Sequence, residues 1–324
     1  MRLYLVELTR LRSRRAVAVL LAAAFVAGAL LLGGTLWSHR PINAADLAQA
    51  QQQVDQLTDS PRTQRQLERC QANPQRYGAS DDPSECEQMV LPQVDWFLSR
   101  PQLDPVELSN NLPLGLALVA GVIAVLIGAT FIGAEWSAGS VGTQLLYETR
   151  RSRVWLAKAA AVATVSAVLA FIFFTVVWTG VLVAHRSWIG EPLPPGFTGD
   201  LTWTGLRVTA FAAFAGLMAY AVTAALRHTV VIVGLMLAYS VIGEGLLREF
   251  VPSIERYLVS VNSFAWIDKA YAITVYPEAS CFSRASCQPT QTRIELLDAA
   301  VYFGVIGAVV LLASLLVFHR RDVP

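Results

Sequence analysis

Long apolar segments alternate with shorter polar ones along the chain, and this pattern predicts the fold. Crossing a hydrocarbon core of about 30 Å takes roughly 20 apolar residues in a helix, because a helix satisfies its own backbone hydrogen bonds. Six segments meet this requirement, at residues 16–37, 112–134, 159–184, 208–226, 229–247 and 299–318. We therefore expect an all-α integral membrane protein with six transmembrane helices.

The first apolar segment is longer than the core of a signal peptide. Five arginines precede it, and Ser13-Arg14-Arg15 faintly resembles a twin-arginine signal. However, the apolar run exceeds the roughly 7–15 residues of a signal core, and residues 33–37 contain no Ala-x-Ala cleavage pattern. We expect an uncleaved first helix.

Composition supports a membrane protein, and the distribution of charge predicts its orientation. The chain is 54% hydrophobic and 15% charged, with a mean hydropathy of +0.47 and a net charge of only +1, which argues against nucleic-acid binding. With both termini in the cytoplasm, the cytoplasmic segments hold 12 Lys or Arg against 4 acids, and the rest holds 13 bases against 20 acids. Basic residues favour the cytoplasmic side of a membrane, so we expect both termini there.

This orientation places residues 38–111 outside the cell as an insert between the first two helices. Asp46 to Arg69 is predicted to form a polar helical arm, and residues 90–98 a second short helix that packs on the arm or rests at the lipid interface. The insert holds eleven acids against six bases. A solvated acidic face is favoured over a funnel for cationic substrates.

All four cysteines fall on the predicted outer side, where disulfides persist. Cys70 and Cys86 lie in the insert, and Cys281 and Cys287 lie in the last outer segment. Three pairings are possible, and the local pairs Cys70–Cys86 and Cys281–Cys287 are favoured because short loops close at the least entropic cost; free thiols are the alternative. We expect no metal site, because there is no Cys-x-x-Cys motif and each of the four histidines sits alone at a helix end.

The last outer segment, residues 248–298, contains a moderately apolar stretch from Tyr257 to Tyr276. Asp268 and Lys269 interrupt it, which argues against a seventh span. We expect an interfacial or re-entrant helical pair that leads into the sixth span.

The sequence offers no candidate for an enzyme or a cofactor site. A P-loop needs a lysine directly after its last glycine, but the only two lysines follow Ala157 and Asp268. No Gly-x-Ser-x-Gly, no His-Glu-x-x-His and no pair of intramembrane carboxylates occurs. Glu244 is the one ionisable residue in a span and so a possible functional residue, although a depth of roughly 22 Å along its helix favours an interfacial glutamate over a proton relay.

The loop after the second helix, residues 135–158, carries a recognisable motif. It has Glu135, then Gly139-Ser140, then Leu145-Leu146, then Ser152-Arg153 and finally Lys158. This arrangement resembles the loop of permease subunits of type-two ABC (ATP-binding cassette) exporters. The chain departs from the pattern by lacking the proline that usually precedes Ser-Arg, where it has Arg150-Arg151 instead.

The resemblance implies a coupling helix that presses into a groove of a separate ATPase subunit. The residues it assigns to this coupling are Glu135, Gly139, Ser140, Val141, Thr143, Leu145, Leu146 and Arg153. Of these, Val141, Leu145 and Leu146 are expected to form one apolar patch. The alternative for the loop is a positive-inside connector with an amphipathic turn. Residues 1–15 likewise resemble the cytoplasmic elbow segment of such permeases.

By the same resemblance, the chain is a permease of the bacterial cytoplasmic membrane that moves a hydrophobic or amphiphilic substrate such as a lipid, drug or peptide. Its expected partners are two ABC-type ATPase subunits, a second permease that is identical or related, and membrane lipid, with no nucleic acid. The first alternative is an ATP-independent secondary transporter or channel that uses Glu244. The second is a membrane-anchored interaction protein whose insert is the working part.

Overall fold

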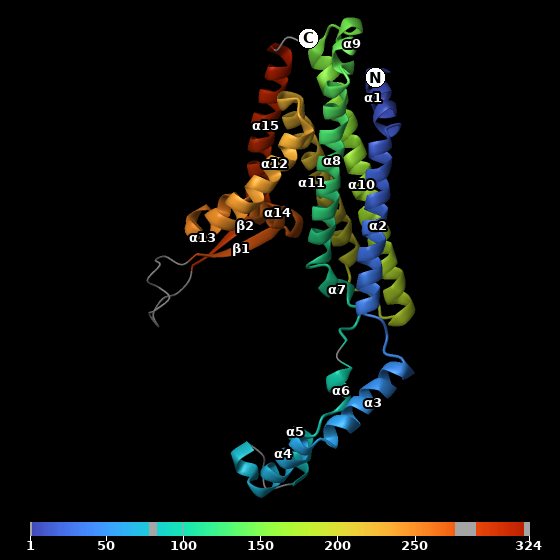
Figure 1. Cartoon of the computed structure of the whole chain (residues 1–324), viewed down its shortest axis with the longest axis vertical. Helices are drawn as coiled ribbons and strands as arrows, with labels where there is room; N and C mark the ends of the chain where they lie inside the picture. The colour runs from blue at the N-terminus through green and yellow to red at the C-terminus, as the bar shows by residue number, and fades with distance from the viewer. Residues whose placement is uncertain (1, 78–82, 99, 276–289, 321–324) are drawn as a thin grey trace. The chain divides into compact units, whose positions relative to one another are not determined.

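The computed structural model of the chain describes residues 2–77, 83–98, 100–275 and 290–320 (Figure 1). The chain divides into two compact units, which we call the bundle and the insert. The bundle comprises Met1–Leu32, Pro105–Val183 and Glu191–Pro324, and the insert comprises Gly33–Asp104 and Ala184–Gly190.

Six of the described helical segments are long and apolar enough to cross a membrane, which confirms the predicted fold class. They are α2 (Arg15–Ser38), α8 (Leu112–Ser137), α10 (Arg151–Trp188), α11 (Phe197–Leu226), the run Thr229–Phe250 and α15 (Leu296–Arg320). The fifth of these consists of α12 (Thr229–Ala238), the π-helical segment η2 (Tyr239–Leu247) and the single turn α13 (Arg248–Phe250). A short helix, α1 (Arg2–Arg12), precedes the first span.

Several helices extend beyond the apolar segments that predicted them. Helix α10 has 38 residues, whereas its apolar segment covers 159–184, and α11 starts at Phe197 rather than at 208. Hydropathy detects only the part of a helix that suits lipid, whereas the backbone hydrogen bonds continue through polar turns. The additional turns carry the polar side chains that anchor each end of the bundle.

Helices α8 and α11 form the centre of the bundle and cross with their backbones nearly in contact. A Cβ atom added to Gly128 would overlap the carbonyl oxygen of Gly216, and one added to Gly216 would overlap Ser166 Oγ. Small residues allow this kind of close approach between membrane helices. Around this crossing, Ile127, Phe131 and Tyr220 are fully buried.

The segment before the last span differs from the expected helical pair. It contains η3 (Pro252–Tyr257) and one ten-residue helix, α14 (Val259–Asp268), followed by an antiparallel ribbon of β1 (Ala270–Val275) and β2 (Thr290–Glu295). Apolar packing stabilises the ribbon, because Ile273 and Ile294 from the two strands pack against Val261 and Ala265 of α14. The described part contains no second helix after α14 and before α15.

The insert is helical, but its arm is broken where one helix was expected. Its helices are α3 (Ala44–Thr58), α4 (Pro61–Ala72), α5 (Pro83–Val90) and α6 (Val94–Phe97), with the 3₁₀ turn η1 (Pro74–Tyr77). The arm divides at Ser60-Pro61, because the Ser60 side chain accepts a hydrogen bond from Thr63 N while Pro61 occupies the first helical position. The short helix expected at 90–98 is likewise reduced to α6.

One carboxylate organises the start of the insert. Asp46 forms a capping box with Asn43 and receives two hydrogen bonds from the guanidinium of Arg100, at 2.7 and 2.8 Å, with Arg40 at 3.3 Å. These bonds from Arg100, together with the backbone N–H of Asn43, hold the pKa of Asp46 well below its usual range. The pair joins the two ends of the insert, 54 residues apart in sequence.

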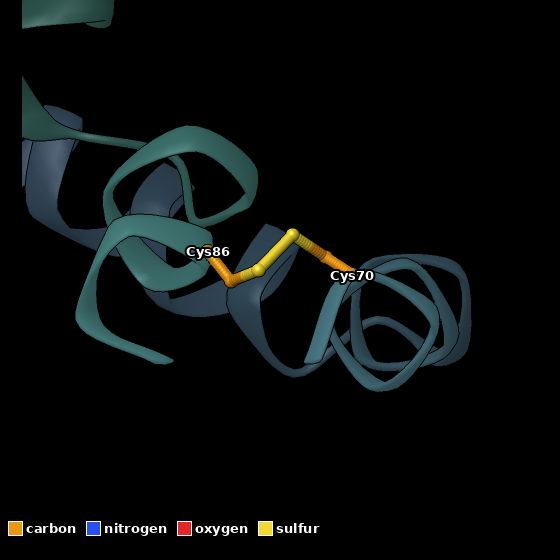
Figure 2. The surroundings of a disulfide bond; sticks show 2 residues. All are labelled: Cys70 and Cys86. Atoms are coloured by element: carbon orange, nitrogen blue, oxygen red, sulfur yellow. A yellow bond between two sulfur atoms is a disulfide. The ribbon is translucent and has the colours of Figure 1, made fainter. Parts of the chain in front are cut away.

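A disulfide between Cys70 and Cys86 ties α4 to α5, as Figure 2 shows, and confirms the local pairing predicted for these two residues. Both cysteines are fully buried, and they pack with Leu67 and Val90 into the small core of the insert. Cys281 and Cys287 lie outside the described residues, so their predicted pairing stays a prediction.

Candidate functional site

The loop between α8 and α10 folds into a short helix, α9 (Ser140–Tyr147). Gly139 makes the turn possible, because it lies in the left-handed region with φ of +67° and serves as the N-cap of α9. Helices α1 and α9 and the C-terminal end of α15 lie at the same end of the bundle (Figure 1). The guanidinium of Arg151 there donates to the carbonyl oxygen of His319 at 3.2 Å.

The three apolar residues predicted to form one patch on α9 face in different directions. Val141 is fully buried, and Leu145 packs against the same core cluster, which includes Leu11 and Trp155. Leu146 is 81% exposed, and its neighbour Tyr147 is 89% exposed. The spacing of four between Val141 and Leu145 explains the inward face, since residues four apart share one side of a helix. The outward surface of α9 is therefore Leu146 with Tyr147.

The remaining predicted coupling residues occupy two environments. Gly139, Ser140, Thr143 and Arg153 are exposed around α9. Glu135, in contrast, is only 3% exposed in its side chain and points into the bundle. Its carboxylate therefore has no access to a surface and acts through the residues it contacts.

Glu135 belongs to a buried ion network with Glu7, Lys158 and Arg14. The Lys158 ammonium, which is fully buried, lies 2.6 Å from Glu7 Oε2 and 2.6 Å from Glu135 Oε2. Arg14 contacts the other oxygen of Glu135, with Nη2 at 2.8 Å from Oε1, and donates to the Phe131 carbonyl oxygen at 2.9 Å. We call these four residues the ion network.

The charges of these four residues balance one another, and Arg10, whose side chain is 49% exposed, lies at the edge of the network with Nη1 3.4 Å from Glu7 Oε1. Two carboxylates face one ammonium and one guanidinium, and the ring of Phe131 lies 4.9 Å from the Arg14 guanidinium carbon and 5.3 Å from Lys158 Nζ. An unpaired charge in such a place would be costly, whereas a paired and hydrogen-bonded one is tolerated. Removing one member therefore affects every other member.

The ion network connects α9 to three other helices. Glu7 comes from α1, Glu135 from α8 and Lys158 from α10. Gln144 on the inner side of α9 donates to Glu7 Oε1 at 2.6 Å. Polar contacts therefore run without a break from Gln144 on α9 through Glu7 and Lys158 to α10 and α8.

A second set of hydrogen bonds continues from α10 into the bundle. Tyr220 on α11 donates to the carbonyl oxygen of Trp155 at 3.0 Å. The indole of Trp155 donates to Ser314 Oγ at 3.3 Å, and Ser314 donates to the carbonyl oxygen of Ala221 at 2.6 Å. Trp155 lies one turn before Lys158, so the same part of α10 carries both the ion network and these contacts to α11 and α15.

Glu244, the single ionisable residue predicted within a span, fastens the fifth span to α14. Its Oε1 accepts hydrogen bonds from Tyr239 and from the backbone N–H of Ser260, both at 2.9 Å, and its Oε2 accepts from the Ser260 hydroxyl. Tyr239 in turn accepts from the backbone N–H of Val259 at 2.8 Å. Glu244 therefore caps the N-terminus of α14, where a negative charge is favourable.

Sequence reasoning assigned no functional role to two members of the ion network, Arg14 and Glu7. Glu7 is the one that left a signal in the sequence. It is the only acid in the arginine-rich first 15 residues, and it lies on the same helical face as Leu11, four residues later, which is also fully buried. A lone acid on the apolar face of an otherwise basic helix was the available signal. Among the described residues, no group of three or more His, Cys, Asp or Glu could hold a metal ion.

Together, these features define a polytopic membrane protein with six candidate spans, a short N-terminal helix packed on them and a helix with an exposed tip between the second and third spans. The family model described as ABC-2 family transporter protein matches residues 7–323. The chain belongs to this family, which confirms the resemblance drawn from residues 135–158. No curated protein and no solved structure matches the chain.

Family membership defines the general role of the chain. It is an ABC-type permease, a membrane transport component that partners with an ABC ATPase subunit.

Proposed function

We propose that the chain is the permease of an ATP-driven exporter, and that α9 is the element through which the ATPase subunit moves the membrane helices. One observation carries this proposal. Helix α9 has an exposed apolar tip of Leu146 and Tyr147, and its inner side is bonded to the ion network through Gln144 and Glu7. An exposed apolar helix tip suits a groove on a partner. The ion network supplies a mechanical link from that tip to α1, α8 and α10.

The proposal includes an orientation and a direction of transport. Helix α9 and both termini of the chain face the cytoplasm of a bacterial cell, and the insert lies outside, in keeping with the distribution of basic and acidic residues. Two ATPase subunits and a second permease, identical or related, complete the transporter. The substrate is hydrophobic or amphiphilic, because the spans present Ala, Val, Leu and Phe to their surroundings.

The limited burial of three spans supports the need for a second permease. Within α2, the fifth span and α15, few side chains are buried inside the single chain, whereas α8 buries most of its own. Such apolar faces suit either lipid or another permease. The insert, closed by its disulfide, would then serve the outer side of the paired permeases.

The ATP-independent alternative that uses Glu244 has less support. Both carboxylate oxygens of Glu244 are engaged by Ser260 and Tyr239, and the residue caps α14. A carboxylate that holds a helix end through these bonds serves a structural purpose without any transport role.

Leu146→Asp tests the proposal at the tip of α9. We expect normal membrane insertion but loss of ATP-driven transport in proteoliposomes that contain the permease and its ATPase. The loss of an anchor in an interface typically costs about 2 kcal/mol or more, which is a roughly 30-fold weaker association. Leu57→Asp is the matched control, because Leu57 is a 44% exposed leucine of the insert. Unchanged transport by the Leu146 variant would refute the proposed role of α9.

A further inference from the structure

A cavity of about 590 Å³ lies in the bundle where three chain segments meet. Arg14 and Arg15 contribute from the start of α2, Ser137 from the end of α8, and Arg227 and His228 from the turn between α11 and α12. This volume falls within the range of about 300–1,000 Å³ that is usual for small-molecule sites. The cavity lies at the ends of four candidate spans, the level at which a membrane meets water.

The lining of this cavity is basic. Three arginines and one histidine line it, and no aspartate or glutamate is among its lining residues. Arg14 is already bonded to Glu135 and to the Phe131 carbonyl oxygen. The carboxylate partner of Arg14, Glu135, belongs to the ion network and is not among the lining residues of the cavity.

Two of the other basic side chains are well placed to receive an anion. The side chain of Arg15 is exposed and forms no hydrogen bond or ion pair with any residue that the structure describes. Arg227 also lines the cavity, and its guanidinium carbon lies 4.3 Å from the centroid of the Trp136 ring, a cation–π contact. A guanidinium held in this way presents a rigid fork of donors to phosphate oxygens.

The start of α12 adds to the positive potential of the cavity. Its N-cap residue, His228, makes no side-chain capping bond, and Thr229 at the first helical position lines the cavity. The first N–H groups of a helix have no intrahelical partner and carry partial positive charge.

We propose that this cavity binds an anionic phosphoryl group at the membrane interface, with Arg15, Arg227 and His228 as its ligands. The headgroup of an anionic phospholipid and a free phosphate share this chemistry. Arg14 both contacts Glu135 and lines the cavity. An anion bound in the cavity would therefore lie next to the ion network and interact with it through Arg14. The inference goes beyond the proposed function and does not depend on it.

The test measures the thermal stability of the full chain purified in detergent. Phosphatidylglycerol is added in one arm, phosphatidylcholine in the second and inorganic phosphate in the third. We expect phosphatidylglycerol to raise the melting temperature and phosphatidylcholine not to. A comparable rise with inorganic phosphate would assign the same site to a free anion. The absence of any rise with both phosphatidylglycerol and phosphate would overturn the proposal.

Arg15→Gln and Arg12→Gln form a matched pair for this test. Both arginines are exposed and lie three residues apart, but only Arg15 lines the cavity. Arg15→Gln should raise the concentration of phosphatidylglycerol needed for the half-maximal effect by at least about fivefold, the contribution of one basic residue at an anionic membrane surface. Arg12→Gln should leave it unchanged. Equal effects of the two variants would show that general surface charge is responsible and would refute the site.

A second variant of the cavity keeps the test decisive if Arg15→Gln fails to fold. His228→Gln also alters the cavity, at an exposed side chain that makes no capping bond. It should weaken the response to phosphatidylglycerol, because the variant removes one of the basic side chains that line the cavity. A full response in both His228→Gln and Arg15→Gln would contradict the proposed ligands.

Discussion

Replacing Lys158 with methionine should strongly destabilise the protein and abolish ATP-driven transport. Lys158 is fully buried between Glu7 and Glu135, so the variant removes the cation that the two buried carboxylates share. Arg14 then remains on Glu135, and Glu7 keeps only the longer contact with Arg10, at 3.4 Å. Removing one partner of a buried ion pair typically costs about 3–5 kcal/mol. The melting temperature in detergent and transport in proteoliposomes measure the two effects.

The second lysine of the chain provides the control for this prediction. Lys269 is the only other lysine in the chain, and it pairs with Asp200 on the surface, with side chains 55% and 70% exposed. Exposed pairs of this kind contribute little. Lys269→Met should therefore leave both measurements near the wild-type values. Equal losses in the two variants would mean that burial in the ion network is not what makes Lys158 important.

A double variant separates charge balance from packing. Lys158→Met with Glu7→Gln removes one charge of each sign and leaves the Arg14–Glu135 pair intact. Balanced removal of buried charges is often nearly neutral for stability. The double variant should thus recover much of the lost stability but not the transport, because the link from α9 through Glu7 is weakened.

Replacing Gly128 with valine is expected to be the most damaging change in the membrane-spanning part. Any Cβ at this position would overlap the carbonyl oxygen of Gly216, so α8 and α11 would have to separate. Overpacking usually costs about 1–3 kcal/mol, and we expect at least the upper end because backbone rather than side chain must move. Size-exclusion chromatography and melting temperature in detergent measure the effect.

Gly115→Val is the matched control on the same helix. Nothing lies within 4 Å of a Cβ added to Gly115. The variant should elute and melt like the wild type. A Gly128 variant that also behaves like the wild type would show that the two helices do not cross as closely as described.

Most of the fold could be predicted from the sequence because lipid imposes a simple rule on composition. A span must contain about 20 residues of apolar helix, so α2, α8 and α15 are each recognisable by the uncharged segment within them, at residues 16–37, 112–134 and 299–318. The break in the arm at Ser60-Pro61 could also have been predicted, because serine followed by proline is a typical helix start. We expected one continuous helix there because polar residues recur on both sides of the break.

The parts that could not be predicted depend on contacts between distant residues. Strands β1 and β2 are separated by 14 residues, and no short turn motif next to either strand predicts a hairpin. Ile273 and Ile294 can be identified as core residues only once α14 is known to pack against them. Glu7 and Lys158 are 151 residues apart, so their pairing arises from the packing of α1 on α10. The motif in residues 135–158 indicated which loop matters, but not which of its residues face inward.

The central claim is that the exposed tip of α9 contacts the ATPase subunit. A photo-crosslinking amino acid placed at Tyr147, which is 89% exposed, tests it in cells that produce both proteins, with Tyr77 of the insert, 44% exposed, as the comparison position. We expect an adduct with the ATPase subunit from position 147 and none from position 77. An ATPase that assembles with the permease but gives no adduct at 147, or gives one at 77, would contradict it.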